Sequence, residues 1–152
     1  MDITPYLELK PASRAVFERL PTHRARARFM IPTADGDWRC VTWGGFAGMI
    51  RDLALWLQSV GVAPGDRAVV FAPNRVEWGA AALAIQSAGA VMVPLYGAST
   101  ASQAAYVIDH SDARVVFVDT PALLGRLFEA WAQLPKVERV VLLDEALDAG
   151  RV

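Results

Sequence analysis

The chain has 152 residues, 54% of them hydrophobic and 20% charged, and its formal net charge at pH 7 is −1. This length suits one domain with one core, and the arginines lie scattered beside acids, which argues against nucleic-acid binding. Because the hydrophobic fraction exceeds the roughly 45–50% typical of soluble domains, we expect apolar surface beyond what one core hides, and a partner that covers it.

Cysteine and histidine are sparse in this sequence. Cys40 is the single cysteine, which excludes an intrachain disulfide and a multi-cysteine zinc site and favours a reducing compartment. His23 and His110 lie far apart without clustered cysteine or acidic ligands, so no metal is assigned. The first ten residues lack the basic region and apolar stretch of a secretory signal. We therefore expect a cytoplasmic protein.

The amino-terminal lead-in, residues 1–26, is expected to hold a short helix. Ser13 is placed to cap this helix and Pro21 to end it. Residues 27–42 follow as a predicted β-hairpin. Asp35-Gly36 lies between two β-like runs of this segment and is expected to supply the positive φ angles of a tight turn.

A charge-free run marks the predicted core. Residues 78–108 contain no Asp, Glu, Lys or Arg, a length that could suggest a membrane span. Gly89 and Pro94 divide the run into an alanine-rich helical half and a short β-like half. We therefore expect no membrane span, but a buried helix followed by a buried strand. Upstream, apolar residues recur at helical spacing over residues 46–60 and predict an amphipathic helix that packs on the core.

Capping signals predict where the later helices begin. Asn74 with Glu77, and Thr100 with Gln103, have the spacing of a capping box. Thr120-Pro121 combines a preferred N-cap residue with a proline at the first helical position. Each of these motifs follows a β-like apolar run, so strands and helices are expected to alternate.

This alternation predicts an α/β fold: a parallel sheet with flanking helices, preceded by an N-terminal helix and the hairpin. Parallel neighbours require long crossover connections, which the helices provide. One subdomain is expected over residues 1–152, with the αβ units in residues 43–144. The strands are predicted at residues 67–72 (central), 90–95, 114–119 and 137–143, and the helices between them at residues 74–88, 100–110 and 123–133.

Ligands of parallel α/β sheets bind beyond the carboxyl ends of the strands, so a site is sought there. The loops at that edge are residues 73–75, 95–100, 119–120 and 144–145. None has the glycine pattern of a phosphate cradle. The nearest approach, residues 44–48, is interpreted as close packing or a loose first helical turn. Arg75 is interpreted as a solvated side chain, and Asp66 as a carboxylate that bonds backbone N–H groups in its own turn.

One loop offers a candidate ligand surface. Tyr96, Gly97, Ser99 and Thr100 combine an aromatic ring with small residues at the carboxyl end of a predicted strand, and they are proposed as a pocket wall. Ser99 has no evident base near it, so it is not interpreted as a nucleophile. No catalytic, cofactor-binding or metal-binding residue is assigned.

Several segments taken together resemble one enzyme family. The ordered series resembles the amino-terminal part of the adenylate-forming acyl-CoA synthetases, over roughly residues 31–143. The NR-x-EW segment, the VPLY segment with its Ser-Thr sequel, and the HSDAR segment at residues 110–114 are most similar to the long-chain fatty acid–CoA ligase branch. In chain order the matching segments are residues 43–48, LALWL at 53–57, GV at 61–62 with GDR at 65–67, NRVEW at 74–78, and AGAV at 88–91 with VPLY at 93–96.

The resemblance implies a part of a larger enzyme. Members of the family activate a carboxylic acid with ATP to an acyl adenylate, release pyrophosphate, and transfer the acyl group to coenzyme A. The parent enzyme would therefore use ATP, Mg²⁺ and coenzyme A, with a fatty acid as substrate. The family's phosphate loop, aromatic-Gly-x-Thr-Glu segment, ribose-binding Asp, hinge and carboxy-terminal Lys have no counterpart in this sequence. The resemblance implies a non-catalytic framework that contacts the remainder of the parent chain, a homodimer surface in some members, and a peripheral membrane location for the parent.

Three alternatives stay open at this point. A stand-alone protein-interaction module would be favoured by a stop codon after Val152, and a nucleotide-binding or small-molecule-binding domain by saturable binding of ATP. The parent could also be another acid–CoA or acyl-AMP ligase of the same superfamily. Trp78 opens the charge-free run and is expected to be buried, so Trp78→Ala is predicted to cost about 3–5 kcal/mol.

Overall fold

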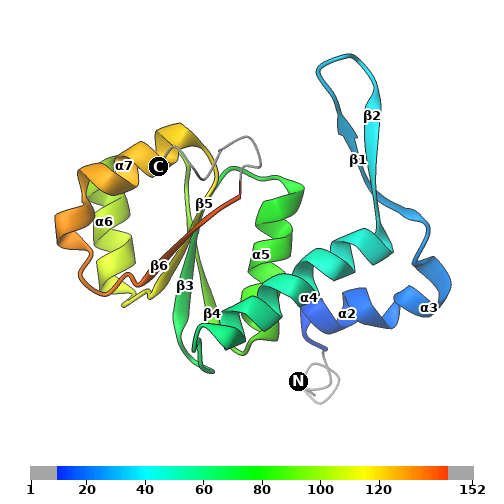
Figure 1. Cartoon of the computed structure of the whole chain (residues 1–152), viewed down its shortest axis with the longest axis horizontal. Coiled ribbons are helices and arrows are strands. Elements are labelled where there is room, and N and C mark those ends of the chain that lie inside the picture. The colour runs from blue at the N-terminus through cyan, green and yellow to red at the C-terminus, as the bar shows by residue number, and fades with distance from the viewer. Residues whose placement is uncertain (1–9, 144–152) are drawn as a thin grey trace, which may run out of the picture.

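The computed structural model describes residues 10–143 of the chain. Within these residues a parallel sheet is covered by helices on both faces, and an antiparallel hairpin stands beside it (Figure 1). The predicted fold class is confirmed. The sheet has the order β4-β3-β5-β6, and its strands are β3 (Arg67–Phe71), β4 (Val91–Leu95), β5 (Val115–Val118) and β6 (Arg139–Leu142).

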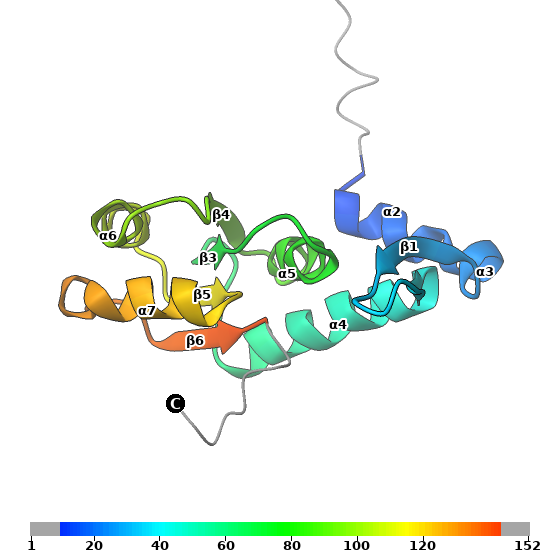
Figure 2. The ribbon, with the colours of Figure 1, turned by 90° about the horizontal axis from the view of Figure 1, so that it is seen from above.

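Two pairs of helices enclose the sheet (Figure 2). Helices α4 (Trp43–Ser59) and α5 (Val76–Ser87) cover one face, and α6 (Ala101–His110) and α7 (Pro121–Glu129) cover the other. Alternate residues of β3 face the two layers: Val70 packs with α4 and α5, and Val69 with α6 and α7. Because β3 and β5 are covered on both faces, their sequences are apolar without alternation. The predicted central place of β3 is confirmed.

The charge-free run is less buried than its composition predicts. Its helical half, α5, lies largely in the core, but β4 is at the edge of the sheet and Val91 is 50% exposed. Trp78 is half-buried and packs against the core cluster on the α4 and α5 face of the sheet. The prediction of a buried β4 is therefore wrong, and Trp78 is buried only in part. Composition indicates which segments avoid water, but it does not indicate which strand lies at an edge.

From residue 10 on, the amino-terminal region contains two short helices, α2 (Ala12–Glu18) and α3 (Leu20–His23). Pro11 is the N-cap of α2, and Ser13 is buried inside the first turn without a side-chain capping bond. The predicted Ser13 cap is therefore wrong. Pro21 lies in the first turn of α3, where a proline is tolerated because that N–H has no helical partner. The first nine residues of the predicted lead-in lie outside the described residues.

The hairpin pairs β1 (Ala27–Pro32) with β2 (Trp38–Thr42) and projects from the body of the molecule (Figure 1). Only Gly36 of its turn has a positive φ, +89°, so the expectation for Asp35 is wrong. The Asp35 carboxylate accepts a bond from the Thr33 hydroxyl at 2.5 Å, and the Thr33 N–H donates to the Asp37 carbonyl at 2.8 Å. Side-chain bonding thus replaces a second positive φ in closing this longer loop.

Helix α4 begins directly after the hairpin. The Thr42 hydroxyl accepts from the Gly45 N–H at 3.0 Å, so the helix starts at Trp43, earlier than predicted. A Cβ at Gly44 would lie 2.9 Å from Cγ of Arg24, which confirms the close packing expected for this glycine segment. The glycine is needed because the chain before the hairpin passes against the first turn of the helix.

Two of the three predicted helix starts are confirmed. Thr100 and Gln103 form a complete capping box, and Thr120 caps α7 with Pro121 in its first turn. The Asn74–Glu77 box is wrong, because the N-cap of α5 is Arg75 and no side chain caps it. The helix predicted to run to residue 133 divides into α7 and a 3₁₀ turn, η1 (Trp131–Gln133).

Candidate functional site

The carboxyl edge of the sheet contains a point where the connections change direction. β3 and β5 are neighbours and parallel, yet the chain leaves β3 toward α5 on one face and leaves β5 toward α7 on the other. In open α/β sheets such a switch point forms the crevice in which ligands bind. The residues that follow these two strands are therefore the first place to seek a site.

An ion pair closes this crevice. Nη1 of Arg75, just after β3, lies 2.6 Å from Oδ1 of Asp119, which directly follows β5. The Asp119 side chain is 2% exposed and that of Arg75 is 35% exposed. Arg75 is thus not the freely solvated residue that the sequence suggested. Both residues were recognised as belonging to carboxyl-end loops, but their pairing depends on β5 lying beside β3.

The same arginine holds a second carboxylate. Nε of Arg75 donates to Oε2 of Glu77 at 2.7 Å, and Nη2 of Arg39, on β2, lies 3.8 Å from Oε1 of Glu77. Burial alone would raise the pKa of Glu77, but the hydrogen bond and charge of Arg75 bring it below the ordinary value. The bond to Glu77, followed by the charge of Asp119, raises the pKa of Arg75. A chain of charges therefore links the hairpin to the centre of the sheet.

The four residues predicted as a pocket wall form the turn between β4 and α6. Tyr96 is 84% exposed, and its carbonyl accepts the N–H of Ser99 at 2.9 Å. Arg126 of α7 donates to the carbonyls of Gly97, at 2.7 Å, and of Ser99, at 3.1 Å. Sequence reasoning missed this arginine, which pins the turn from another helix. The role of these residues as a pocket wall stays a prediction.

Thr100 completes this turn and is the N-cap of α6. Its hydroxyl accepts from the Gln103 N–H at 3.3 Å and lies 3.1 Å from the Ser102 hydroxyl. The carboxyl-end loop predicted at residues 144–145 lies outside the described residues. Of the loops at this edge, those after β3 and β5 thus meet through an ion pair, and the loop after β4 is fixed by α7.

A second cluster of charges lies at the amino edge of the sheet. Oδ2 of Asp66 accepts the Ala63 N–H at 2.9 Å, which confirms its interpretation as a turn residue, and also lies 2.8 Å from Nη1 of Arg114. These partners, the backbone bond first, lower the pKa of Asp66. Arg114 also binds Glu138 at 2.9 Å. With cations and acids matched in this way, the cluster joins loops and holds the strands' amino ends together.

The described residues offer little to a metal ion. Among residues 10–143 no group of three or more His, Cys, Asp or Glu side chains is placed to hold one. His23 meets the ring of Trp43 with centroids 6.0 Å apart, and His110 stacks on Tyr106 at 5.4 Å. In the same part of the chain, no helix combines the length and apolar character that crossing a membrane requires.

Comparison with known families decides the affiliation. A family model described as AMP-binding enzyme matches residues 15–151. The chain belongs to this AMP-binding enzyme family. Across 124 residues it is 39% identical to the long-chain-fatty-acid–CoA ligase FadD15 of Mycobacterium bovis, a match that covers 76% of this chain and 21% of the relative. A Mycobacterium tuberculosis 3-[(3aS,4S,7aS)-7a-methyl-1,5-dioxo-octahydro-1H-inden-4-yl]propanoyl:CoA ligase is 32% identical over 139 residues, 87% of this chain and 25% of the relative.

Solved structures repeat the fold of this AMP-binding chain. The anthranilate CoA ligase AuaEII in complex with anthranoyl-AMP superposes with a TM-score of 0.81 at 20% identity, over 94% of this chain and 27% of that one. The N-terminal domain of FACL13 from Mycobacterium tuberculosis has a TM-score of 0.75 at 20% identity, over 89% of this chain and 34% of that one. At these identities the likeness establishes the fold alone. The chain spans 21% of the FadD15 length.

The triphosphate of a nucleoside triphosphate does not fit the residues at the switch point. Phosphate cradles present free N–H groups and cations, whereas Arg75 already binds two carboxylates there. A phosphate group brought to this crevice would face the negative charges of Asp119 and Glu77.

Proposed function

We propose that the chain is the amino-terminal framework of a long-chain fatty acid–CoA ligase. The parent reaction joins a fatty acid and ATP to an acyl adenylate with release of pyrophosphate, and then transfers the acyl group to coenzyme A with release of AMP. ATP, Mg²⁺ and coenzyme A belong to the parent enzyme in this proposal. Its partners are the remainder of the parent chain and, for the assembled enzyme, a second copy.

The observation that carries this proposal is the 39% identity to FadD15 over 124 residues. The likeness in fold to the N-terminal domain of FACL13 supports the amino-terminal placement. The chain matches 21% of the FadD15 length, so most of such a ligase would lie outside these residues.

By itself the chain is proposed to be inactive. Activation of an acid by ATP depends on preorganised donors and cations around the transferring phosphoryl groups. At the switch point the arginine fork of Arg75 is engaged by Glu77 and Asp119. The donors that handle phosphate are therefore assigned to residues outside the chain.

A second substrate class has its own support. The relative that covers 87% of this chain is named for a bulky two-ring propanoate rather than for a long-chain acid. FadD15 has the higher identity, 39% against 32%, which favours the straight-chain acid. Both classes share the adenylation and thioester steps, so they differ in the acid alone.

The test uses the product of the whole reading frame that contains these residues. Pyrophosphate release is measured with ATP and Mg²⁺ in the presence of palmitate or of the two-ring propanoate, with and without coenzyme A. We expect acid-dependent release that is at least ten times faster with palmitate, and formation of palmitoyl-CoA. Faster pyrophosphate release with the two-ring acid would show that the substrate is a two-ring acid rather than a long-chain acid. No release with either acid would overturn the proposed function.

A further inference from the structure

Helix α5 has no polar side. After Glu77 its sequence is an unbroken run of glycine, alanine and larger apolar residues up to Gln86. A helix at the surface of a domain normally alternates an apolar face with a polar one, whereas a helix that is apolar all round is covered on all sides. The core covers one side of α5, where Ala81 and Ile85 are completely buried. The apolar residues on the opposite side of α5 therefore need a second packing partner.

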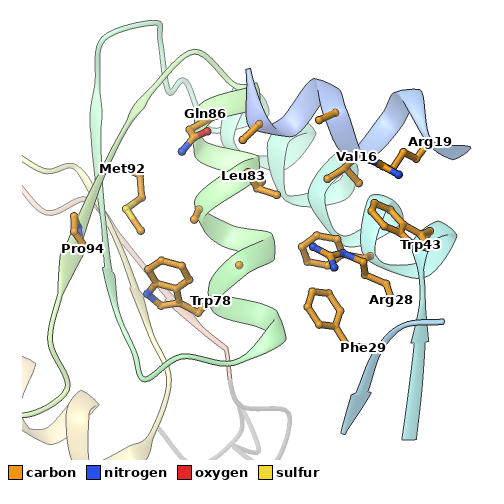
Figure 3. Close-up of a pocket in the computed structure, with 15 residues that line it drawn as sticks. Val16, Arg19, Arg28, Phe29, Trp43, Trp78, Leu83, Gln86, Met92 and Pro94 are labelled. Carbon is orange, nitrogen blue, oxygen red and sulfur yellow. The ribbon is translucent and has the colours of Figure 1, made fainter. Parts of the chain in front are cut away.

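That opposite side is the floor of an open groove (Figure 3). Gly79, Leu83 and Gln86 of α5 form the floor, Met92 and Pro94 of β4 form one bank, and α2 with the hairpin and the start of α4 forms the other. The groove has a volume of about 630 Å³ and a mainly apolar lining. We use the term α5 groove for this cavity.

The far bank of the α5 groove carries two arginines, Arg19 and Arg28. Arg28 lies 4.6 Å from the ring centroid of Trp43, and Arg19 lies 5.7 Å from the same centroid. Both arginines are exposed and line the groove, and neither forms an ion pair with a residue among positions 10–143. Arginines that lie on an aromatic ring beside an apolar floor can donate hydrogen bonds to a carboxylate.

The shape of the groove favours a polypeptide. Small-molecule sites usually enclose most of the ligand's surface, but the α5 groove is open to solvent. The chain covers 21% of the FadD15 length, so a parent ligase has ample polypeptide to lay across it. The apolar floor and the cations on one bank also define the chemistry of the segment that would fit.

We infer that the α5 groove is the docking site for a segment of the parent ligase encoded outside residues 1–152. This segment presents apolar side chains to Leu83 and Met92 and at least one carboxylate to Arg19 and Arg28. The inference rests on the proposed function in requiring a longer parent chain. It goes further in naming the contact surface and the chemistry of the contacting segment.

Cysteine accessibility tests this assignment. In a Cys40→Ser background, Ala15→Cys places an exposed thiol on the α2 bank of the groove and Gln86→Cys places one on its floor. Gln58→Cys on α4 is the control outside the groove. Maleimide labelling rates are compared between the 152-residue chain and the product of the whole reading frame. We expect the two groove positions to label at least ten times more slowly in the longer product, and the control to change less than twofold.

Charge reversal tests the acidic contact. In the longer product, Arg19→Glu with Arg28→Glu should restore rapid labelling of Gln86→Cys, whereas Arg51→Glu on the exposed side of α4 should not. Equal labelling rates of Gln86→Cys in the short and long products would overturn the inference, and so would protection of Gln58→Cys as strong as that of Gln86→Cys. A reading frame that stops at Val152 would also overturn it. Protection of Gln86→Cys already in the short chain, together with a dimer in light scattering, would overturn it as well. Pyrophosphate release by the same longer product is read separately, so loss of the proposed function and loss of the docking site are distinguished.

Discussion

The guanidinium of Arg75 and the buried carboxylate of Asp119 meet at 2.6 Å, although they lie 44 positions apart in the chain. They join the ends of neighbouring strands at the point where an open α/β sheet ordinarily admits a ligand. Glu77 binds the same guanidinium, and Nη2 of Arg39 lies 3.8 Å from Oε1 of Glu77, so two arginines and two carboxylates gather at this crevice. At this switch point the guanidinium of Arg75 is thus engaged by the protein's own carboxylates.

Loss of this ion pair should destabilise the fold. Arg75→Met leaves the Asp119 carboxylate buried without its arginine, and we expect a loss of about 2–3 kcal/mol, the low side for a broken buried pair because Arg75 is partly exposed. Arg51→Met is the matched control, since Arg51 pairs with exposed Asp52 and should change stability by less than about 0.5 kcal/mol. The measurement is urea unfolding followed by tryptophan fluorescence. Equal losses for the two variants would show that the buried pair does not stabilise the fold.

The ionised Glu77 carboxylate should contribute to the pH dependence of the free energy of unfolding. Its pKa lies below the ordinary value of 4.5 in the folded chain, so its contribution is fully present above pH 4.5 and is lost as the pH falls through the folded pKa. We therefore expect the free energy of unfolding to fall as the pH decreases below 4.5. Glu77→Gln should reduce the slope of this fall, with urea midpoints measured from pH 6 to pH 3. An unchanged slope would contradict the assignment, whereas a residual slope is expected from Asp66, whose pKa is also lowered.

The helix caps offer a paired test. Thr120→Ala removes the hydroxyl that accepts the Leu123 N–H at 3.3 Å, and should cost about 1 kcal/mol. Asn74→Ala should cost less than about 0.5 kcal/mol, because no side chain caps α5. Thermal unfolding of the two variants beside the parent chain provides the comparison. A cost at Asn74 equal to that at Thr120 would restore the capping box that the sequence suggested.

Two aromatic residues report on burial. Phe117 is completely buried in the sheet, so Phe117→Ala should cost about 3–5 kcal/mol. Trp78 is half-buried, and Trp78→Ala should cost about 1–2 kcal/mol in the 152-residue chain, less than its sequence context predicts. Urea unfolding followed by circular dichroism measures both without depending on the removed tryptophan. The reverse order of costs would place Trp78 in the core after all.

The features predicted correctly from the sequence are those that depend on neighbours along the chain. Thr100 with Gln103 and Thr120 with Pro121 bond to their own first turns, so their spacing was enough. The sequences of β3 and β5 are apolar without alternation because helices cover both of their faces, and this pattern indicated the parallel α/β class. The αβ alternation then predicted the crossovers.

The features that were missed depend on partners distant in the chain. Glu77 has capping spacing from Asn74, but Arg75 and Arg39 compete for its carboxylate and bind it instead. The edge position of β4 follows from the order of strands, which local sequence does not specify. The pairing of Arg75 with Asp119 required the same information. A signal was present in both cases, since each charged residue follows an apolar strand at the edge where parallel strands end.

We propose that these residues supply framework and that the groups that handle phosphate lie elsewhere in the parent enzyme. The decisive measurement is calorimetric titration of the purified 152-residue chain with ATP and Mg²⁺, and separately with a non-hydrolysable palmitoyl adenylate analogue. We expect no saturable heat with either ligand at millimolar concentration, while the product of the whole reading frame binds the adenylate analogue. Saturable binding of either ligand by the short chain, weakened by Arg75→Met, would contradict it.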